Sequence, residues 1–193
     1  MVEVSNMPPI IGITGKAGSG KDTLAAYFVE HHGYVKYALA DPLKQELNHL
    51  FGWKPARWED RDWKEKYMYG GKTPREWAQW LGAFARHVDE DHWIGTLMLR
   101  AFDEGNIGRL VISDVRYDNE AEAIIANNGI VLEVVRPGIT PVTEHHSENG
   151  VSLELIHDSL NNHGTADELG QKAAFAAAAW YAARQIVRKT QRA

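Results

Sequence analysis

A glycine-rich segment near the start of the chain has the residue types and spacing of a phosphate-binding loop. After the apolar run of residues 8–14, it reads Gly15-Lys16-Ala17-Gly18-Ser19-Gly20-Lys21-Asp22-Thr23. Glycines at this spacing let backbone N–H groups turn toward a polyphosphate, and the following helix adds its positive N-terminus. The lysine of such a P-loop reaches the β and γ phosphates. We therefore predict that residues 15–23 bind a nucleoside triphosphate; a strand-to-helix turn without a ligand is the alternative.

The residue after the P-loop lysine departs from the usual pattern. Asp22 stands where the general motif has Ser or Thr, and Thr23 follows it. A carboxylate here can hold Mg²⁺ directly or through water, and Thr23 can bond the α-phosphate. The same carboxylate repels phosphates unless Lys21 and a metal ion compensate its charge. Metal ligation is therefore the part of the motif that the sequence leaves open.

A second acidic residue follows an apolar segment that we expect to be a buried strand. Residues 109–112 form this segment, Asp114 follows its end, and Arg116 comes two residues later. In P-loop proteins, a carboxylate at this place faces Mg²⁺ and its waters. An arginine just past the strand can reach a phosphoryl group from the acceptor's side. For Asp114, an Asx turn or a helix cap is the alternative.

The elements that position these residues alternate along the first part of the chain. A helix is expected over residues 21–31 and a strand over residues 35–40. Asp41 is the expected N-cap of the next helix, which has Pro42 in its first turn and ends at Gly52. Asp41 and Lys44 would then lie at the carboxyl end of a strand, where open α/β sheets bind ligands.

Residues 53–95 differ in composition and are expected to form a small helical insert, because six of the seven tryptophans gather there. A capping box at Thr73 to Glu76 predicts a helix from Pro74 to about His87. At about 100° per residue this helix has an apolar face and a polar face. The apolar face favours subdomain core over a base-stacking platform. The polar face suits either a phosphate and a base edge or simple solvation. The apolar face carries Trp77, Trp80, Leu81 and Phe84. The polar face carries Arg75, Gln79, Gly82 and Arg86.

The remaining chain continues the alternation. Helices are expected from about Asp89 to before Gly105, over 119–125 and from a second capping box at Thr165, and strands over 130–135 and 155–160. Residues 136–150 lack a period and form either a lid over the donor phosphates or an ordinary surface loop. About five strands alternating with helices predict an α/β fold with a parallel sheet and right-handed crossovers.

Bulk properties restrict the class of protein. A chain of 193 residues with 44% apolar content suits one compact domain with a small insertion. The absence of cysteine excludes disulfides and thiol chemistry, and a net charge of −5 argues against nucleic-acid or anionic-membrane binding. The longest apolar run, residues 173–183, is about half a membrane span, and residues 1–7 lack the features of a signal peptide. We expect a cytoplasmic protein without a membrane or nucleic-acid partner.

Together these motifs resemble the bacteriophage-type deoxynucleoside monophosphate kinases of the P-loop nucleoside monophosphate kinase superfamily. The resemblance spans most of the chain and includes the GKDT form of the P-loop. It rests on GKAGSGKDT at 15–23, YALADPLK at 37–44, TPREWAQWLGAFAR at 73–86, ISDVRYDNEAEAI at 112–124, and HHSENG and NNHGTADEL in the C-terminal third. Kinases of phosphomevalonate and of dephospho-coenzyme A share pieces of this pattern, so their substrates are the alternative acceptors.

The resemblance implies transfer of the γ-phosphoryl of ATP to a deoxynucleoside 5′-monophosphate, with Mg²⁺ as cofactor, in the host cytoplasm if the source is viral. It implies a core of residues 8–52 and 96–193, an acceptor-binding insert at 53–95 and a lid at 136–150. By this resemblance, the catalytic residues of the chain would be Lys21, Asp114 and Arg116, and the metal ligands would be Asp22 and Asp114. Arg136 would join residues 15–23 in binding ATP. Acceptor binding would fall to Asp41, Lys44, Arg75, Gln79, Arg86 and Arg116.

Other classes of protein fit less well. A small GTPase would need a guanine-reading Asn-Lys-x-Asp motif, which the chain lacks. The acidic balance disfavours a nucleic-acid-stimulated ATPase. A regulatory module that binds ATP without phosphorylating an acceptor stays open, although the arginine-rich insert makes it less attractive. The accepted bases, the choice between deoxyribose and ribose, and the oligomeric state, monomer or homodimer, are not decided by the sequence.

Overall fold

A computed structural model describes residues 7–138 and 150–191 of the chain. The chain divides into two compact units, one made of residues up to Ala38 and from Arg100 onward, the other of Leu39–Leu99. The second unit therefore begins before the expected insert of residues 53–95 and takes in the helix that precedes it. Most of the expected lid, residues 139–149, lies outside the described residues.

The first unit is built on five parallel strands in the order β2-β3-β1-β4-β5. The strands are β1 (Ile10–Thr14), β2 (Val35–Tyr37), β3 (Leu110–Ile112), β4 (Ile130–Val135) and β5 (Asp158–Asn161). The prediction of an α/β fold with a five-stranded parallel sheet is confirmed. The strand expected over residues 35–40 is shorter than predicted, because the next helix already begins at Ala40.

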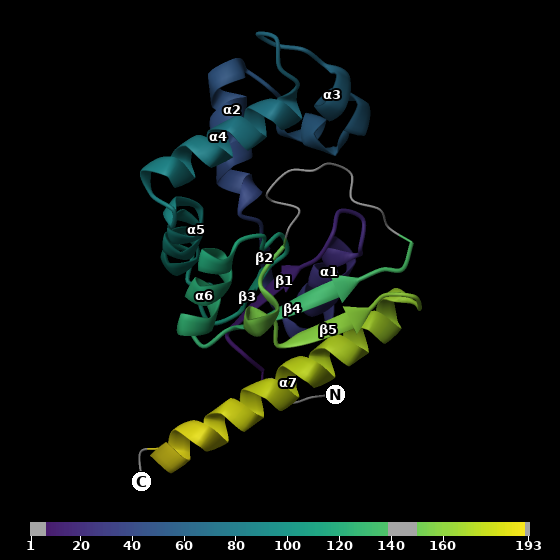
Figure 1. The fold of residues 1–193 in the computed structure, drawn as a ribbon, viewed down its shortest axis with the longest axis vertical. Coiled ribbons are helices and arrows are strands. Elements are labelled where there is room, and N and C mark those ends of the chain that lie inside the picture. Colours follow the sequence, from purple (N-terminus) through teal and green to yellow (C-terminus); the bar gives the residue numbers. More distant parts are fainter. Residues whose placement is uncertain (1–6, 139–149, 192–193) are drawn as a thin grey trace. The chain divides into compact units, whose positions relative to one another are not determined.

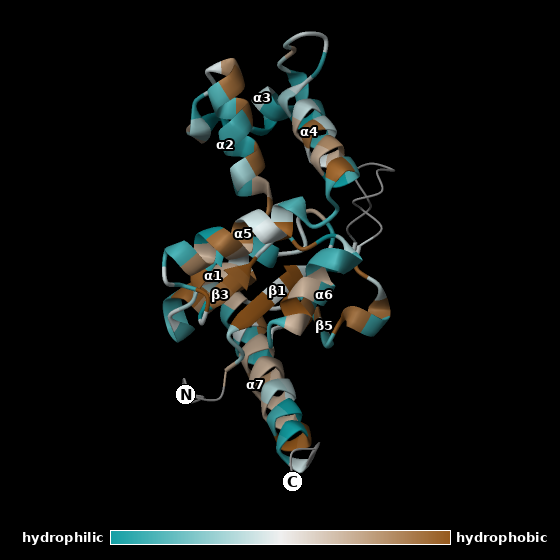
Figure 2. Cartoon of the chain, turned by 90° about the vertical axis from the view of Figure 1, so that its left-hand side faces the viewer, coloured by the Kyte–Doolittle hydropathy of each residue, from teal (hydrophilic) through white to brown (hydrophobic). Residues whose placement is uncertain are grey.

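Helices cover both faces of this sheet, as Figure 1 shows for α1 (Lys21–His32), α6 (Asp118–Ala126) and α7 (Ala166–Gln191). On one face, Leu24 and Phe28 of α1 pack with side chains of β1, β4 and α7 in a fully apolar core. On the other face, α6 packs closely on β1, because a Cβ at Gly12 would lie only 2.7 Å from Ile124 Cδ1. Figure 2 shows the hydrophobic strands β1 and β3 between helices of mixed hydropathy. Burying these apolar side chains provides the main driving force for folding this unit.

The carboxyl ends of the strands gather the chain's polar motifs at one edge of the sheet. The P-loop leaves β1, and Asp114 and Arg116 follow β3. Two backbone hydrogen bonds extend the sheet around Asp114: Ser113 N–H donates to the Tyr37 carbonyl and Val115 N–H to the Ile13 carbonyl, both at 3.1 Å. Asp114 is thereby held between the ends of neighbouring strands, beside the start of the P-loop.

The second unit contains α2 (Ala40–Phe51), a short 3₁₀ helix η2 (Pro55–Glu59), α3 (Arg61–Lys66) and α4 (Pro74–Val88), while α5 (His92–Asp103) runs across the division. The prediction of Asp41 as N-cap is wrong. The cap position is Leu39, whose backbone is already helical, so Asp41 lies within the first turn. Aromatic rings fill much of this unit, and the Trp58 indole donates to Asn48 Oδ1 at 2.8 Å.

The helix α4 begins as predicted, with a complete capping box between Thr73 and Glu76. Its faces are not used as predicted. Trp80 and Phe84 stack on each other but are 51% and 55% exposed, so they are not core. Gly82, on the polar face, is buried, and a Cβ there would lie 3.1 Å from Leu43 Cδ1 of α2. The absent side chain at Gly82 lets the two helices approach closely, which turns the polar face inward.

Candidate functional site

The P-loop joins β1 to α1 and is shaped by glycines in conformations that other residues rarely adopt. Gly15, Gly18 and Gly20 have φ angles of 131°, 78° and 109°. A Cβ at Gly15 would lie 2.4 Å from the Val134 carbonyl oxygen, so only glycine lets the loop pass this close to β4. Gly20 is the N-cap of α1 and supplies no side-chain cap, which leaves the N–H groups of the first turn pointing into the loop.

The side chain of Lys21 folds back over the first residues of the P-loop. Its ammonium donates hydrogen bonds to the carbonyl oxygens of Gly15 at 2.7 Å and of Lys16 at 2.9 Å. The hydroxyl of Ser19, in the same loop, is buried and has no hydrogen-bond partner among the described residues. A buried hydroxyl without a partner is costly unless a ligand satisfies it, and a phosphate oxygen can do so. The loop thus combines a fixed positive charge, oriented N–H groups and an unsatisfied donor.

Asp22 forms an ion pair that sequence reasoning missed. Its Oδ1 accepts a hydrogen bond of 2.6 Å from Nζ of Lys36, which lies on β2. Desolvation acts to raise the pKa of Asp22, but Lys36, Lys21 and the Ser113 hydroxyl outweigh it and lower the pKa below its usual value. Asp22 is therefore a carboxylate at neutral pH, with a cation from the neighbouring strand beside it. Thr23, one residue further on α1, is exposed.

The turn after β3 carries Asp114 and Arg116. Asp114 is half-buried and Arg116 is exposed. Glu120, which is 1% exposed, stabilises this turn. Its carboxylate accepts hydrogen bonds from the backbone N–H groups of Arg116 at 2.8 Å and of Tyr117 at 3.1 Å. A carboxylate that accepts backbone N–H groups at a helix start also interacts favourably with the helix dipole. Glu120 is thus a positioning residue for Arg116.

A cavity of about 540 Å³ lies beside the P-loop, within the first unit. Cationic and acidic side chains both line it: Lys16, Lys21 and Arg116 on one hand, Asp118 and Glu133 on the other. Asp118 accepts hydrogen bonds from the backbone N–H and the hydroxyl of Ser152, at 2.8 and 2.6 Å, which ties the wall of the cavity at residues 150–153 to the start of α6. The Ser152 hydroxyl, followed by its N–H, lowers the pKa of Asp118. A cavity of this size suits a small nucleotide.

Another residue that sequence reasoning missed is Asn162, which follows β5. Its side-chain Nδ2 donates to the Ser19 carbonyl at 2.7 Å, and its backbone N–H donates to the Val135 carbonyl at 2.7 Å. Asn162 therefore connects the P-loop to the end of β4, where Arg136 follows and is exposed. The Asn-Asn-His-Gly stretch before the second capping box was the available signal, but its partner is 143 residues away in sequence.

The predicted acceptor residues of the second unit form two groups. Asp41 and Lys44 make an ion pair of 3.9 Å within the first turn of α2. On α4, Arg75, Gln79 and Arg86 flank buried Gly82, whose carbonyl accepts a hydrogen bond from the Trp93 indole. A role of these α4 residues in binding an acceptor stays a prediction.

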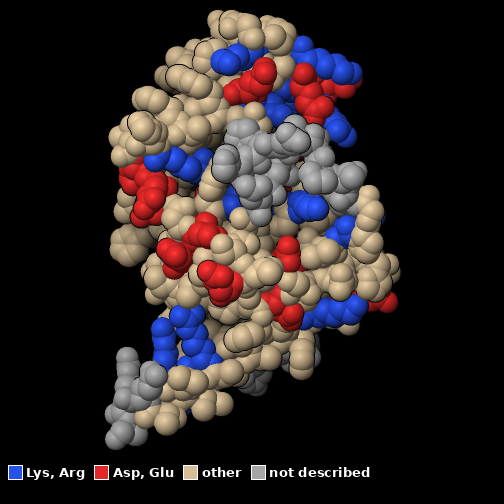
Figure 3. Space-filling view, in the orientation of Figure 1, with Lys and Arg blue, Asp and Glu red and all other residues tan. Residues whose placement is uncertain are grey.

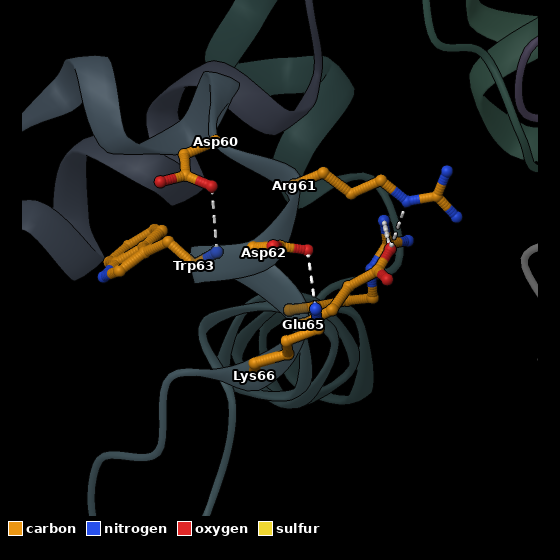
Figure 4. Close-up of polar contacts among 7 residues, drawn as sticks. Asp60, Arg61, Asp62, Trp63, Glu65 and Lys66 are labelled. Atoms are coloured by element: carbon orange, nitrogen blue, oxygen red, sulfur yellow. Dashed lines mark hydrogen bonds and ion pairs between the residues drawn. The ribbon is translucent and has the colours of Figure 1, made fainter.

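Two nitrogens of the Arg75 guanidinium have different surroundings. Its Nη2 lies 3.2 Å from Glu65 Oε1, an oxygen that also contacts Arg61, as Figure 4 shows for Glu65 and Arg61. Within the described residues, Nε of Arg75 is buried and has no hydrogen-bond partner. A guanidinium with a buried unsatisfied donor is suited to receive an anionic oxygen.

The structure also bears on metals, membranes and surface charge. No group of three His, Asp or Glu side chains that could hold a metal occurs in residues 7–138 and 150–191. No helix among these residues is long and apolar enough to cross a membrane. On the face that Figure 3 draws, Lys and Arg side chains are interspersed with Asp and Glu side chains.

Comparison with known proteins points to one family. The family model of deoxynucleotide monophosphate kinases matches residues 9–81 and 75–173. The chain is 30% identical over 179 residues to a protein of Acanthamoeba polyphaga mimivirus named "Putative deoxynucleotide monophosphate kinase", covering 82% of this chain and 91% of that protein. It is 23% identical to the deoxynucleotide monophosphate kinase of Enterobacteria phage T4, over 84% and 96% of the two chains.

Among solved structures, a gluconokinase from Sinorhizobium meliloti 1021 aligns with a TM-score of 0.47 and 12% identity, covering 93% of this chain and 97% of that one. The family assignment rests on the family match and the two sequence relatives. The two matched segments of the family model include the P-loop, the polar face of α4 and the turn after β3. The chain belongs to the deoxynucleotide monophosphate kinase family.

Proposed function

We propose that the chain transfers the γ-phosphoryl group of ATP to a deoxynucleoside 5′-monophosphate at the carboxyl edge of its sheet. The products are the deoxynucleoside diphosphate and ADP. One observation carries the proposal: the ammonium of Lys21 lies within the glycine loop, and Lys21 and Arg116 line the same cavity. Phosphoryl transfer depends on such an arrangement, because catalysis consists mainly of alignment and charge stabilisation.

The donor triphosphate is proposed to lie in the P-loop. Lys21 interacts with its β and γ phosphates, and the N–H groups of residues 15–23 surround it. The buried hydroxyl of Ser19 gains a phosphate partner there. Arg136, at the end of β4, adds positive charge on the donor's side.

Mg²⁺ is proposed to accompany ATP, and the residues present fit it. Magnesium in nucleotide sites takes most of its ligands from phosphates and water, so one or two protein carboxylates are enough. Asp114, half-buried at the end of β3, and Asp22, at the start of α1, are the two candidate carboxylates. When bound, the metal neutralises charge that develops between the β and γ phosphates.

The acceptor phosphate is proposed to bind Arg116, which Glu120 positions through the backbone. Arg75, Gln79 and Arg86 of α4 are proposed to bind the rest of the acceptor, together with Asp41 and Lys44 of α2. The attacking oxygen belongs to a phosphate that is already ionised, so the reaction needs no general base. The protein instead aligns the two phosphates, neutralises their charge and excludes water.

A coupled assay of ADP release tests this proposal. ATP and Mg²⁺ are offered with a panel of deoxy- and ribonucleoside monophosphates, with phosphomevalonate and dephospho-coenzyme A as alternative acceptors, and products are identified by mass. We expect turnover that depends on at least one deoxynucleoside monophosphate. Turnover only with phosphomevalonate or dephospho-coenzyme A would assign a different kinase substrate, and ATP binding without turnover would indicate a regulatory module.

A further inference from the structure

The P-loop of this chain places a carboxylate directly after its lysine, and the structure shows what lies against that carboxylate. Asp22 is the second residue of α1. The charged and polar groups that face it come from three elements: Lys21 from α1 itself, Lys36 from β2 and Ser113 from the end of β3. Of these, Lys36 is in direct contact, at 2.6 Å.

An uncompensated carboxylate at this place opposes triphosphate binding. Like charges a few ångströms apart repel each other, and solvent at a protein surface screens that repulsion only in part. ATP brings several negative charges into the loop, so an isolated Asp22 would weaken binding by a large factor. A cation 2.6 Å away converts the charge into a short dipole, whose field falls off much faster with distance.

The Asp22–Lys36 ion pair contributes little to the stability of the fold. The Lys36 and Asp22 side chains are 39% and 83% exposed, and ion pairs this exposed contribute little to the free energy of unfolding. The apolar core of this unit lies elsewhere, around Phe28 and Leu132. The position of the pair at the start of α1, directly after the P-loop lysine, points instead to ligand binding.

We propose that Lys36 is a charge-compensating residue for the triphosphate site: it neutralises Asp22 and so lets an aspartate occupy the position after the P-loop lysine. Lys36 does this without contacting the phosphates. The inference rests on the proposed use of residues 15–23 as the ATP site, and it adds a residue from β2 to that site. It also predicts that the need for Lys36 disappears when Asp22 loses its charge.

A double-mutant cycle on ATP affinity tests this proposal. Dissociation constants of ATP, ADP and AMP are measured by calorimetry for the full chain, its Lys36→Met, Asp22→Asn and Asp22→Asn/Lys36→Met variants, and Lys36→Arg, each with Mg²⁺ and with EDTA. Lys66→Met is the matched control, because Lys66 pairs with Asp62 at 2.9 Å on α3. Thermal unfolding of every variant reports the fold.

We expect Lys36→Met to weaken ATP binding in EDTA by about tenfold, with smaller losses for ADP and AMP because they carry fewer charges. Lys36→Arg and Lys66→Met should bind ATP as the unsubstituted chain does. In the Asp22→Asn background, removing Lys36 should change affinity by less than about twofold.

Three results would overturn the proposal. An equal loss from Lys36→Met with and without the Asp22 charge would show that Lys36 binds phosphate directly. Tighter binding of the magnesium complex by Lys36→Met would show that Lys36 competes with the metal for Asp22. Unchanged affinity would show an ordinary surface ion pair. Failure of the unsubstituted chain to bind ATP would instead refute the proposed function itself.

Discussion

Asn162 holds the P-loop from the far end of the chain, because its side-chain Nδ2 donates a hydrogen bond of 2.7 Å to the carbonyl oxygen of Ser19. The same residue donates its backbone N–H to Val135 of β4. A loop that must present several N–H groups to a ligand gains affinity when its shape is fixed before the ligand arrives. The contact therefore connects the residue that follows β5 to the proposed ATP site.

Replacing Asn162 by Ala should weaken ATP binding by about tenfold, since one hydrogen bond to a constrained loop contributes about 1 kcal/mol or somewhat more. Calorimetric titration with ATP measures the effect. Asn127→Ala is the matched control, because the Asn127 side chain also donates to a backbone carbonyl, that of Ala123 on α6. Equal affinities of Asn162→Ala and the unsubstituted chain would show that the loop holds its shape without this bond.

A methyl group at Gly15 should displace the P-loop. The added Cβ would meet the Val134 carbonyl oxygen at 2.4 Å, and alanine also disfavours the φ angle of 131°. We expect Gly15→Ala to lower ATP affinity by at least about tenfold. Gly95→Ala, on α5 where a Cβ meets nothing within 4 Å, should leave affinity unchanged. Normal ATP binding by Gly15→Ala would mean that the loop tolerates a different path past β4.

Removing the carboxylate of Glu120 should impair catalysis more than ATP binding. Without it, two partly buried backbone N–H groups lose their acceptor and the turn that carries Arg116 loosens. We expect Glu120→Ala to lower the free energy of unfolding by about 1–3 kcal/mol. Its kcat should fall while the dissociation constant of ATP stays nearly constant.

Two further variants separate positioning from stability. Glu120→Gln keeps an oxygen acceptor and should recover much of kcat. Glu122→Ala removes an exposed carboxylate from the same helix and should change neither quantity. A Glu120→Ala enzyme with normal kcat would show that Arg116 does not depend on this turn.

His157 should make the stability of the fold depend on pH. Its Nδ1 accepts the Val131 N–H at 3.2 Å, so the ring must be neutral there, and desolvation together with the charge of Arg184 lowers its pKa below 6.5. The unfolded chain then binds a proton first as the pH falls. Stability from His157 is complete above about pH 6.5 and is lost as the pH falls toward the lower pKa of the folded state.

Urea unfolding of the unsubstituted chain and of His157→Gln at pH 8 and at pH 5.5 measures this contribution. The difference in unfolding free energy between the two proteins should shrink at the lower pH. A difference that stays constant would show that His157 is not held in its neutral form by the fold.

Local patterns predicted the parts of this structure that local chemistry determines. The apolar runs before Gly15 and Asp114 became buried parallel strands, and the capping box at Thr73 opens α4. Each of these signals lies within a few residues of the element it specifies. For the same reason the glycine spacing of residues 15–23 predicted the loop.

Contacts between distant segments were not predictable in this way. Lys36 contacts Asp22 across 14 residues of sequence, and Asn162 contacts Ser19 across 143. The sequence around Lys36 and Asn162 does not indicate which residue each one contacts. The orientation of α4 was also missed, because burial followed the close approach at Gly82 rather than the tryptophan face. Asp41 was assigned as a cap although the helical backbone already begins before it.

The central claim is direct transfer of a phosphoryl group from ATP to a nucleotide, and following the phosphorus atom tests it most directly. ATP labelled in its γ phosphate is mixed with enzyme, Mg²⁺ and the deoxynucleoside monophosphates of all four bases, and the labelled products are separated after a single turnover. The account predicts label in at least one deoxynucleoside diphosphate and little in inorganic phosphate. Label released as inorganic phosphate at the same rate with and without acceptors would contradict it.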